Sequence, residues 1–217
     1  MYPKEEEINS VEVERKFLEG SLEHMMADIG PIPIADEDIM PFGWRKAAKG
    51  RTVWRIVEEI ISQNLELKAD NYGFEHVEPA PSEVGVWDFR FKHPNGNNAF
   101  VNIKSSVLGG RKNKDDISKA AGIESFYDLY PEANLYVATF ILKFNDNMTI
   151  EIVDVVVFPV SWIPDLYVNP SNNGNLQSSK YKDIDNAKLR TNQEFIYEFD
   201  EAYEVAKEKR RRKNQKK

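Results

Sequence analysis

The sequence predicts an α/β domain in which a mixed β-sheet is flanked by helices, and three observations carry this prediction. Residues 44–67 place apolar side chains at helical spacing, which is typical of an amphipathic helix. Residues 86–91 and 99–106 are alternating runs around an Asn-Gly turn, which is typical of a β-hairpin. The β-branched and aromatic runs at 134–144 and 150–163 indicate buried strands of the same sheet.

The other segments complete a single expected catalytic and DNA-binding domain, residues 1–217, with a helical N-terminal region (about 1–48) and a basic C-terminal tail (207–217). Thr191 and Glu194 fit a capping box at the start of a final helix, which we expect to fray into the tail. The remaining expected elements are a helix at 10–28, a Gly- and Pro-rich loop at 68–85, a helix at 117–130 that Pro131 ends, and a long polar loop at 167–183.

Composition excludes several classes of site. The chain has no cysteine and only three histidines, so disulfides and thiolate zinc sites are excluded and any metal must be held by oxygen. The N-terminal sequence MYPKEEEINS has no feature of a signal peptide, and no apolar run approaches the length of a membrane span. We therefore expect a cytoplasmic protein with no membrane partner.

Charge is distributed unevenly along the chain. The formal net charge is −7, yet residues 207–217 carry eight basic side chains and one acidic side chain, or +7. The preceding residues therefore carry −14, the difference between −7 and +7. An acidic bulk does not exclude a nucleic-acid partner, because local basic groups near a site decide that question.

The predicted hairpin carries polar residues that packing does not require. Side chains alternate along a strand, so Val101 and Ile103 are expected to face the core while Asn102 and Lys104 point away. Antiparallel pairing then places Asp88 on the same polar face. Two oxygen ligands beside a lysine suit Mg²⁺-dependent phosphodiester hydrolysis, because Mg²⁺ takes few protein oxygens and a lysine can orient or activate the attacking water.

This arrangement resembles the PD-(D/E)XK nuclease superfamily, particularly type II restriction endonucleases, over about residues 50–160. The resemblance rests on a helix with Glu58, then VWD, a gap of 14 residues from Asp88 to Asn102, and VNIKSS. Trp87 stands where the family pattern has proline, and Asn102 is an amide in the slot of the second acid.

The resemblance implies a restriction-endonuclease-like mixed sheet and Mg²⁺-dependent hydrolysis of double-stranded DNA at a specific, palindromic site by a homodimer. It also implies that Asp88 and Asn102 ligate the metal, that Lys104 positions or activates the water, and that Glu58 supports a metal or a water. Glu59 is the competing choice for the helix acid.

Two further segments are candidates for DNA contact. A basic loop follows the motif directly, where it would face the phosphate backbone. The polar loop is rich in Asn and Gln, which can pair with adenine in the major groove. The candidates are Arg111, Lys112 and Lys114 in the basic loop, and Asn169, Asn172, Asn173, Asn175, Gln177, Ser178 and Ser179 in the polar loop.

Several alternatives stay open at this stage. The chain could be another nuclease of the same superfamily, such as a repair enzyme or junction resolvase, or a catalytically inactive DNA-binding protein in which Asn102 marks the loss of the metal site. Asp88 and Lys104 could also form only a solvated cross-strand pair, and the polar loop and basic loop could be ordinary surface. The recognition sequence and the cleavage pattern do not follow from the residues.

Overall fold

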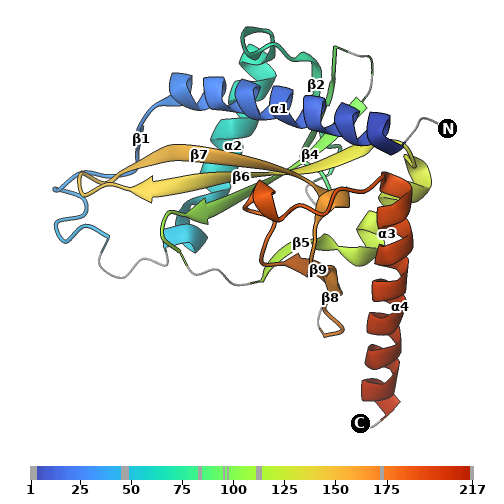
Figure 1. Ribbon diagram of the computed structural model, residues 1–217. Helices are drawn as coiled ribbons and strands as arrows, with labels where there is room; N and C mark the ends of the chain where they lie inside the picture. The colour runs from blue at the N-terminus through green and yellow to red at the C-terminus, as the bar shows by residue number, and fades with distance from the viewer. Residues whose placement is uncertain are drawn as a thin grey trace.

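A six-stranded mixed sheet forms the centre of the molecule, in strand order β1-β7-β6-β4-β3-β2 (Figure 1). The computed structural model describes residues 4–44, 49–82, 85–94, 96, 98–110, 114–171 and 174–215, and only the backbone of residues 49–52. The strands of this sheet are β1 (Ile32–Pro33), β2 (Glu75–Pro79), β3 (Phe89–Lys92), β4 (Asn98–Val107), β6 (Asn134–Phe144) and β7 (Thr149–Pro159).

The pairing of β4 with β6 is parallel, and the other pairs are antiparallel. A parallel pair needs a crossover connection. Here β5 (Asp115–Lys119) and helix α3 (Ala120–Leu129) lie between the two strands in the chain. The predicted fold class, a mixed sheet flanked by helices, is confirmed.

Helices cover the sheet. Helix α1 (Lys4–Ile29) packs along β7 and β6, because Leu18, Leu22 and Met25 recur at helical spacing and are fully buried. Helix α2 (Lys49–Lys68) packs against β4 and β2. In Figure 1, α1 lies on one side of the sheet, while α3, the small second sheet and α4 (Asn192–Gln215) lie on the other.

A second sheet of three antiparallel strands, in order β5-β9-β8, corrects the prediction of a polar loop at 167–183. Its strands β8 (Tyr167–Val168) and β9 (Asn175–Ser178) lie inside that segment. Alternation was present but short: Leu176 and Ser178 are buried, while Asn175 and Gln177 are partly exposed. Because Ser178 is polar although it is buried, the alternation of β9 was not recognised, and the polar composition of the segment was interpreted as a loop.

Other boundaries also differ from the prediction. Helix α1 begins at Lys4 rather than near residue 10, and the loop predicted at 68–85 contains a 3₁₀ turn, Ala69–Tyr72, as well as β2. Strand β5 occupies the start of the helix predicted from residue 117. The predicted fraying near residue 207 is wrong, since α4 continues to Gln215. Two more short 3₁₀ turns span Val160–Trp162 and Ile184–Asn186.

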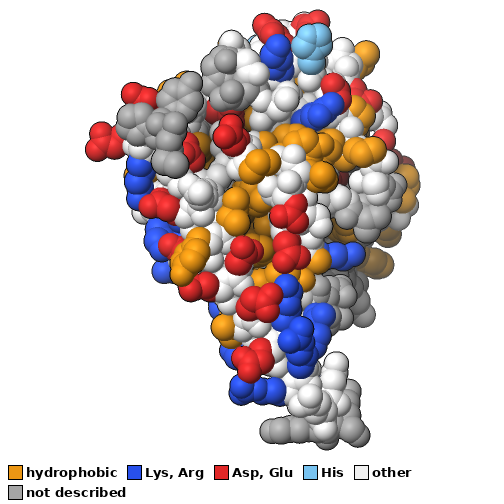
Figure 2. All heavy atoms as spheres, turned by 90° about the vertical axis from the view of Figure 1, so that its right-hand side faces the viewer, with side chains coloured by type: hydrophobic (Ala, Val, Ile, Leu, Met, Phe, Trp, Pro, Cys, Tyr) orange, Lys and Arg blue, Asp and Glu red, His pale blue; other side chains and the backbone are white. Residues whose placement is uncertain are grey.

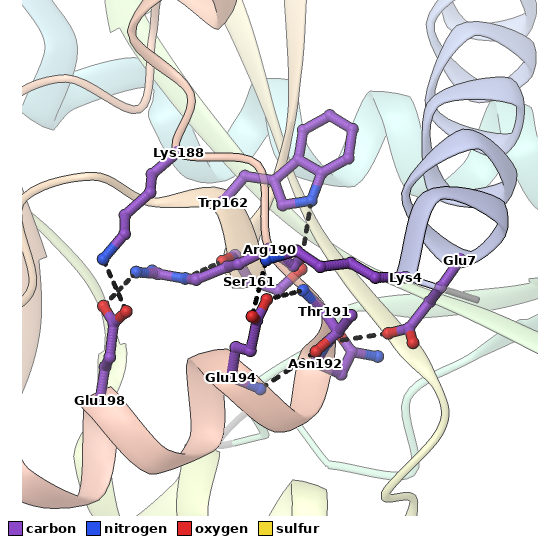
Figure 3. Close-up of polar contacts among 10 residues, drawn as sticks. All are labelled: Lys4, Glu7, Ser161, Trp162, Lys188, Arg190, Thr191, Asn192, Glu194 and Glu198. Carbon is purple, nitrogen blue, oxygen red and sulfur yellow. Dashed lines mark hydrogen bonds and ion pairs between the residues drawn. The ribbon is translucent and has the colours of Figure 1, made fainter. Parts of the chain in front are cut away.

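The start of α4 is held by a buried guanidinium (Figure 3). Arg190 is 2% exposed; it donates hydrogen bonds to the carbonyl oxygens of Ser161 and Ile163 and pairs with Glu198. Burial lowers the pKa of Arg190 from its ordinary value, although Glu198 opposes this shift. The capping box is confirmed: the Glu194 N–H donates to Thr191 Oγ1 at 3.2 Å, and the Thr191 N–H donates to Glu194 Oε2 at 3.0 Å.

Within the described residues, no helix is both long enough and apolar enough to cross a membrane.

We expect Arg190→Ala to lower the free energy of unfolding by about 3–5 kcal/mol, because it leaves two buried carbonyl groups without their donor and removes one of the two cationic partners of Glu198. Lys188→Ala is the matched control. Lys188 also pairs with Glu198, at 2.6 Å, but its side chain is half exposed, so its loss should cost less than about 1 kcal/mol. Urea unfolding of both variants measures the difference, and equal small losses would contradict the assigned role of Arg190.

Candidate metal centre and nucleic-acid interface

The β3–β4 hairpin brings Asp88 against the middle of β4. The ladder pairs Phe89 with Val101, and just before it the Asp88 N–H donates to the Val101 carbonyl at 2.7 Å. The carboxylate then takes the place that a longer β3 would occupy: Asp88 Oδ2 accepts the Ile103 N–H at 2.5 Å. This bond fixes the carboxylate at the level of β4 between Asn102 and Lys104.

Asn102 is buried, at 6% exposure, although the alternation along the strand predicts that its side chain points away from the core. Its Nδ2 donates a hydrogen bond to the Val86 carbonyl at 2.8 Å. Among the described residues, its Oδ1 is buried without a hydrogen-bond partner. A buried acceptor without a partner carries a desolvation cost, and a bound cation would remove that cost.

Glu58 approaches the hairpin from α2, half-buried and within electrostatic range of Asp88 and Lys104. Burial raises the pKa of Glu58 to about 7, and the negative charge of Asp88 adds to this shift. The positive charges of Lys104 and Arg55 oppose it. The competing residue Glu59 is exposed and accepts a hydrogen bond from Gln63 at 2.7 Å, so Glu58 is the helix acid that faces the hairpin.

Asp88 keeps part of its surface in solvent, yet the protein around it raises the pKa of its carboxyl by desolvation. The Ile103 N–H, Lys104 and Arg55 act in the opposite direction, toward the charged form. Glu58, Asp88 and half-buried Lys104 therefore form one electrostatic cluster, with Asn102 beside it on β4. The pKa values of both carboxyls are raised because their charged forms are poorly solvated, and a bound cation would stabilise those charged forms.

Two basic residues near this cluster were missed by sequence reasoning. Arg55 lies one helical turn before Glu58 and stacks on Trp54, with its guanidinium carbon 4.1 Å from the ring centroid. The i, i+3 spacing from Glu58 was a signal that could have found it. Lys182 has its Nζ 3.1 Å from Ser106 Oγ on β4 and 2.5 Å from Asp115 Oδ2. Nothing in the local sequence indicated this contact, since 76 residues separate Lys182 from Ser106.

Of the three candidates in the predicted basic loop, the structure describes Lys114, which lies beside the second sheet. Arg111 and Lys112 lie outside the described residues. Lys114 is exposed, and its Nζ lies 4.1 Å from the ring centroid of Tyr167 on β8. Lys114 thus contacts the segment predicted as a polar loop, residues 167–183, which is called the polar segment below.

The described candidates of the polar segment fall into two groups, three amides and two serines. Asn172 and Asn173 lie outside the described residues. The three amides are partly exposed. Asn169 accepts hydrogen bonds from Ser171, and Gln177 Nε2 donates to Asp116 at 2.6 Å. The Oδ1 atom of Asn175 is buried and has no partner among the described residues.

Ser178 and Ser179 both donate to the Asp165 carboxylate. Burial opposes ionisation of Asp165, but these hydrogen bonds prevail and lower its pKa. Ser178 is completely buried, so its hydroxyl stabilises the end of β9 and is out of reach of a base edge in this conformation. The expectation of a DNA contact from Ser178 is corrected on that ground.

Across the described residues, no group of three or more His, Asp or Glu side chains is placed to hold a metal ion. The donors that the hairpin and α2 bring together are two carboxylates and one amide oxygen. Hard oxygen donors of this kind suit Mg²⁺, which keeps several waters and needs few protein ligands. The residues present therefore fit a magnesium ion with a small protein ligand set.

We expect stability to depend on pH through Glu58. Its pKa is about 7 in the folded state and 4.5 ordinarily, so the folded state binds the proton more tightly and loses stability as pH rises between these values. In metal-free buffer, the free energy of unfolding of the parent should fall relative to that of Glu58→Gln between about pH 4.5 and 7. Exposed Glu59→Gln is the control and should follow the parent; parallel curves for all three proteins would contradict the placement of Glu58.

Comparison with known proteins shows a remote likeness. The chain matches no protein-family model, and no curated protein is significantly similar to it in sequence. Among solved structures, NlaIV restriction endonuclease is similar at 15% identity, with 72% of this chain and 69% of that chain covered and a TM-score of 0.45.

Proposed function

We propose that the chain is a Mg²⁺-dependent endonuclease that hydrolyses duplex DNA at a specific site, in the manner of a type II restriction endonuclease. The observation that carries the proposal is the cluster itself: Glu58 from α2 and Asp88 and Lys104 from the hairpin interact electrostatically, next to an amide oxygen that has no hydrogen-bond partner among the described residues. Helix α2 and the β3–β4 hairpin, two separate parts of the chain, supply this cluster, although a solvated sheet face would not require it.

Each residue has a role in this proposal. Glu58, Asp88 and Asn102 would hold Mg²⁺, which when bound would stabilise negative charge on the scissile phosphate and lower the pKa of a bound water. Lys104 would orient the attacking water or help to remove its proton. Asp88 can keep its ligand geometry through the reaction because the Ile103 N–H holds one of its oxygens.

DNA contact would involve Lys114 and the second sheet beside it. Lys114 would approach the phosphate backbone, as would Arg111 and Lys112. Gln177 and Asn169 are described, partly exposed amides that could reach base edges, in which case Gln177 would exchange its bond to Asp116 for one to a base. A palindromic target would require a homodimer, which sedimentation in the presence of the duplex tests directly.

Cleavage of mixed-sequence plasmid DNA with Mg²⁺ tests the proposed activity. Discrete fragments support a restriction endonuclease. A smear, or a preference for branched substrates, supports a repair nuclease or junction resolvase instead. Binding without cleavage supports a DNA-binding protein whose metal site is disabled at Asn102.

We expect Lys104→Ala to reduce the cleavage rate by at least about 100-fold while duplex binding is retained, because the lysine acts on the water and not on the DNA as a whole. Lys92→Ala is the matched control: Lys92 is exposed at the far end of the same hairpin and should be dispensable. Retained cleavage by Lys104→Ala would refute the site.

Asn102→Asp distinguishes a working amide from a disabling substitution. The Asn102 amide donates to the Val86 carbonyl, so an aspartate there would lose this bond and bring a carboxylate against the carbonyl oxygen. We expect the variant to be less stable by about 1–3 kcal/mol and no more active than the parent. Asn98→Asp, at the exposed start of β4, provides a matched change of charge with little effect. A sharp rise in cleavage by Asn102→Asp would mean that the amide disables the site.

A further inference from the structure

The C-terminal part of α4 extends beyond the body of the molecule. Phe195, Phe199 and Ala206 are buried, but every residue from Glu208 to Gln215 is exposed. In Figure 1 this part of the helix projects past the second sheet to the C-terminus. Most helices owe their stability to a packed apolar face, and this segment has none. The projecting segment, residues 207–215, is called the arm below.

The arm is strongly basic. Its six basic residues are Lys207, Lys209, Arg210, Arg211, Arg212 and Lys213, and Glu208 is its one acid, for a charge of +5. The rest of the chain up to residue 206 carries −14. Figure 2, which shows the side of the molecule on which α4 lies, has Lys and Arg side chains at the projecting end and Asp and Glu side chains above them.

The basic residues of the arm continue the stripe with which α4 packs. That stripe runs through Phe199, Ala202 and Ala206, and the next positions at helical spacing are Lys209, Arg210 and Lys213. These three residues are the inner face of the arm. Acidic residues of the helix occupy the other side, where Glu201, Glu204 and Glu208 follow one another at the same spacing.

Contacts place the inner face beside the polar segment. Arg210 Nε donates a hydrogen bond to the Pro170 carbonyl at 3.3 Å, and a side chain at Gly174 would come within 3.1 Å of the Arg210 guanidinium. Pro170 and Gly174 belong to the connection between β8 and β9. The inner face therefore adjoins the sheet that holds Gln177 and that meets Lys114 at Tyr167.

Two of the inner-face charges are not neutralised within the described part of the chain. Arg212 pairs with Glu208, and Lys207 pairs with Glu124 and Glu204. No described acid lies within ion-pair distance of Lys209 or Lys213, and both are exposed. Cations presented in this way on a helix suit a partner that carries closely spaced negative charge.

We propose that the inner face of the arm binds the phosphate backbone of duplex DNA outside the catalytic cluster, a role that rests on the proposed function. Nine helical residues span about 13 Å, over which a duplex presents roughly eight phosphate charges. The remainder of the molecule has a negative net charge, so cations on a projecting helix supply attraction for DNA that the body as a whole does not provide. The arm thereby holds the duplex against the polar segment of the second sheet.

The test compares two double variants that remove equal charge. Lys209→Gln/Lys213→Gln changes the inner face, and Arg211→Gln/Arg212→Gln changes the other side of the same helix. Binding of a mixed-sequence duplex is measured by fluorescence anisotropy in EDTA, where no cleavage occurs, between about 50 and 200 mM KCl. All four residues are exposed, and circular dichroism verifies that both variants fold.

We expect the inner-face variant to lose roughly 60-fold in affinity at about 0.1 M salt, and its slope of log affinity against log salt to fall by about 2, as for the loss of two phosphate contacts. The other variant should lose less than about fivefold, because distant charges are screened. Equal losses in the two variants would overturn the arm's role, as would absence of duplex binding by the parent. If the inner-face variant lost self-association while its affinity for the duplex stayed unchanged, the arm's role would also be overturned.

Cleavage, measured separately with Mg²⁺ at saturating protein, keeps this proposal distinct from the proposed activity. A parent that binds duplex through the inner face but does not cleave it supports the arm and refutes the nuclease. A parent that cleaves while both variants bind alike supports the nuclease and refutes the arm.

Discussion

The hydrogen-bonding requirement of a central strand places the candidate site. β4 lies between β6 and β3, and its backbone must be satisfied on both edges. Because β3 begins only at Phe89, the N–H of Ile103 extends beyond the ladder and takes the Asp88 carboxylate as its acceptor. One bond thus completes the sheet and fixes an acid beside Asn102 and Lys104. Because the backbone holds one of its oxygens, the Asp88 carboxylate can act as a ligand while its position stays fixed.

The same site is electrostatically incomplete in the protein alone. Burial and mutual repulsion oppose the ionisation of Glu58, and burial does so for Asp88, while Lys104 and Arg55 provide partial compensation. The buried Asn102 Oδ1, which no described residue contacts with a hydrogen bond, adds a further unmet requirement. Under the proposed function, a small hard cation would satisfy all three of these features. The Val86 contact also shows that the amide is accommodated by its surroundings.

The second sheet connects this cluster to the rest of the surface. Its strand β5 follows the hairpin directly, its strands β8 and β9 come from the polar segment, and Lys182 ties the turn after β9 back to Ser106 on β4. Helix α4, whose first turn the Arg190 network anchors, runs beside β8 and carries the basic arm past it. The buried residues Phe195, Phe199 and Ala206 continue this attachment along the helix as far as the start of the arm.

Much of this organisation is determined by local sequence. Side-chain alternation and the Asn-Gly turn determine the hairpin, helical periodicity determines α2, and the Thr191 and Glu194 pair determines the start of α4. Tertiary structure alone decided the rest. Glu58 rather than Glu59 faces the hairpin because the packing of α2 sets its rotation, and Asn102 is buried because both faces of that part of β4 are covered. Strands of two to five residues and the Lys182 contact depend on partners distant in sequence, so a pattern of neighbouring residues could not predict them.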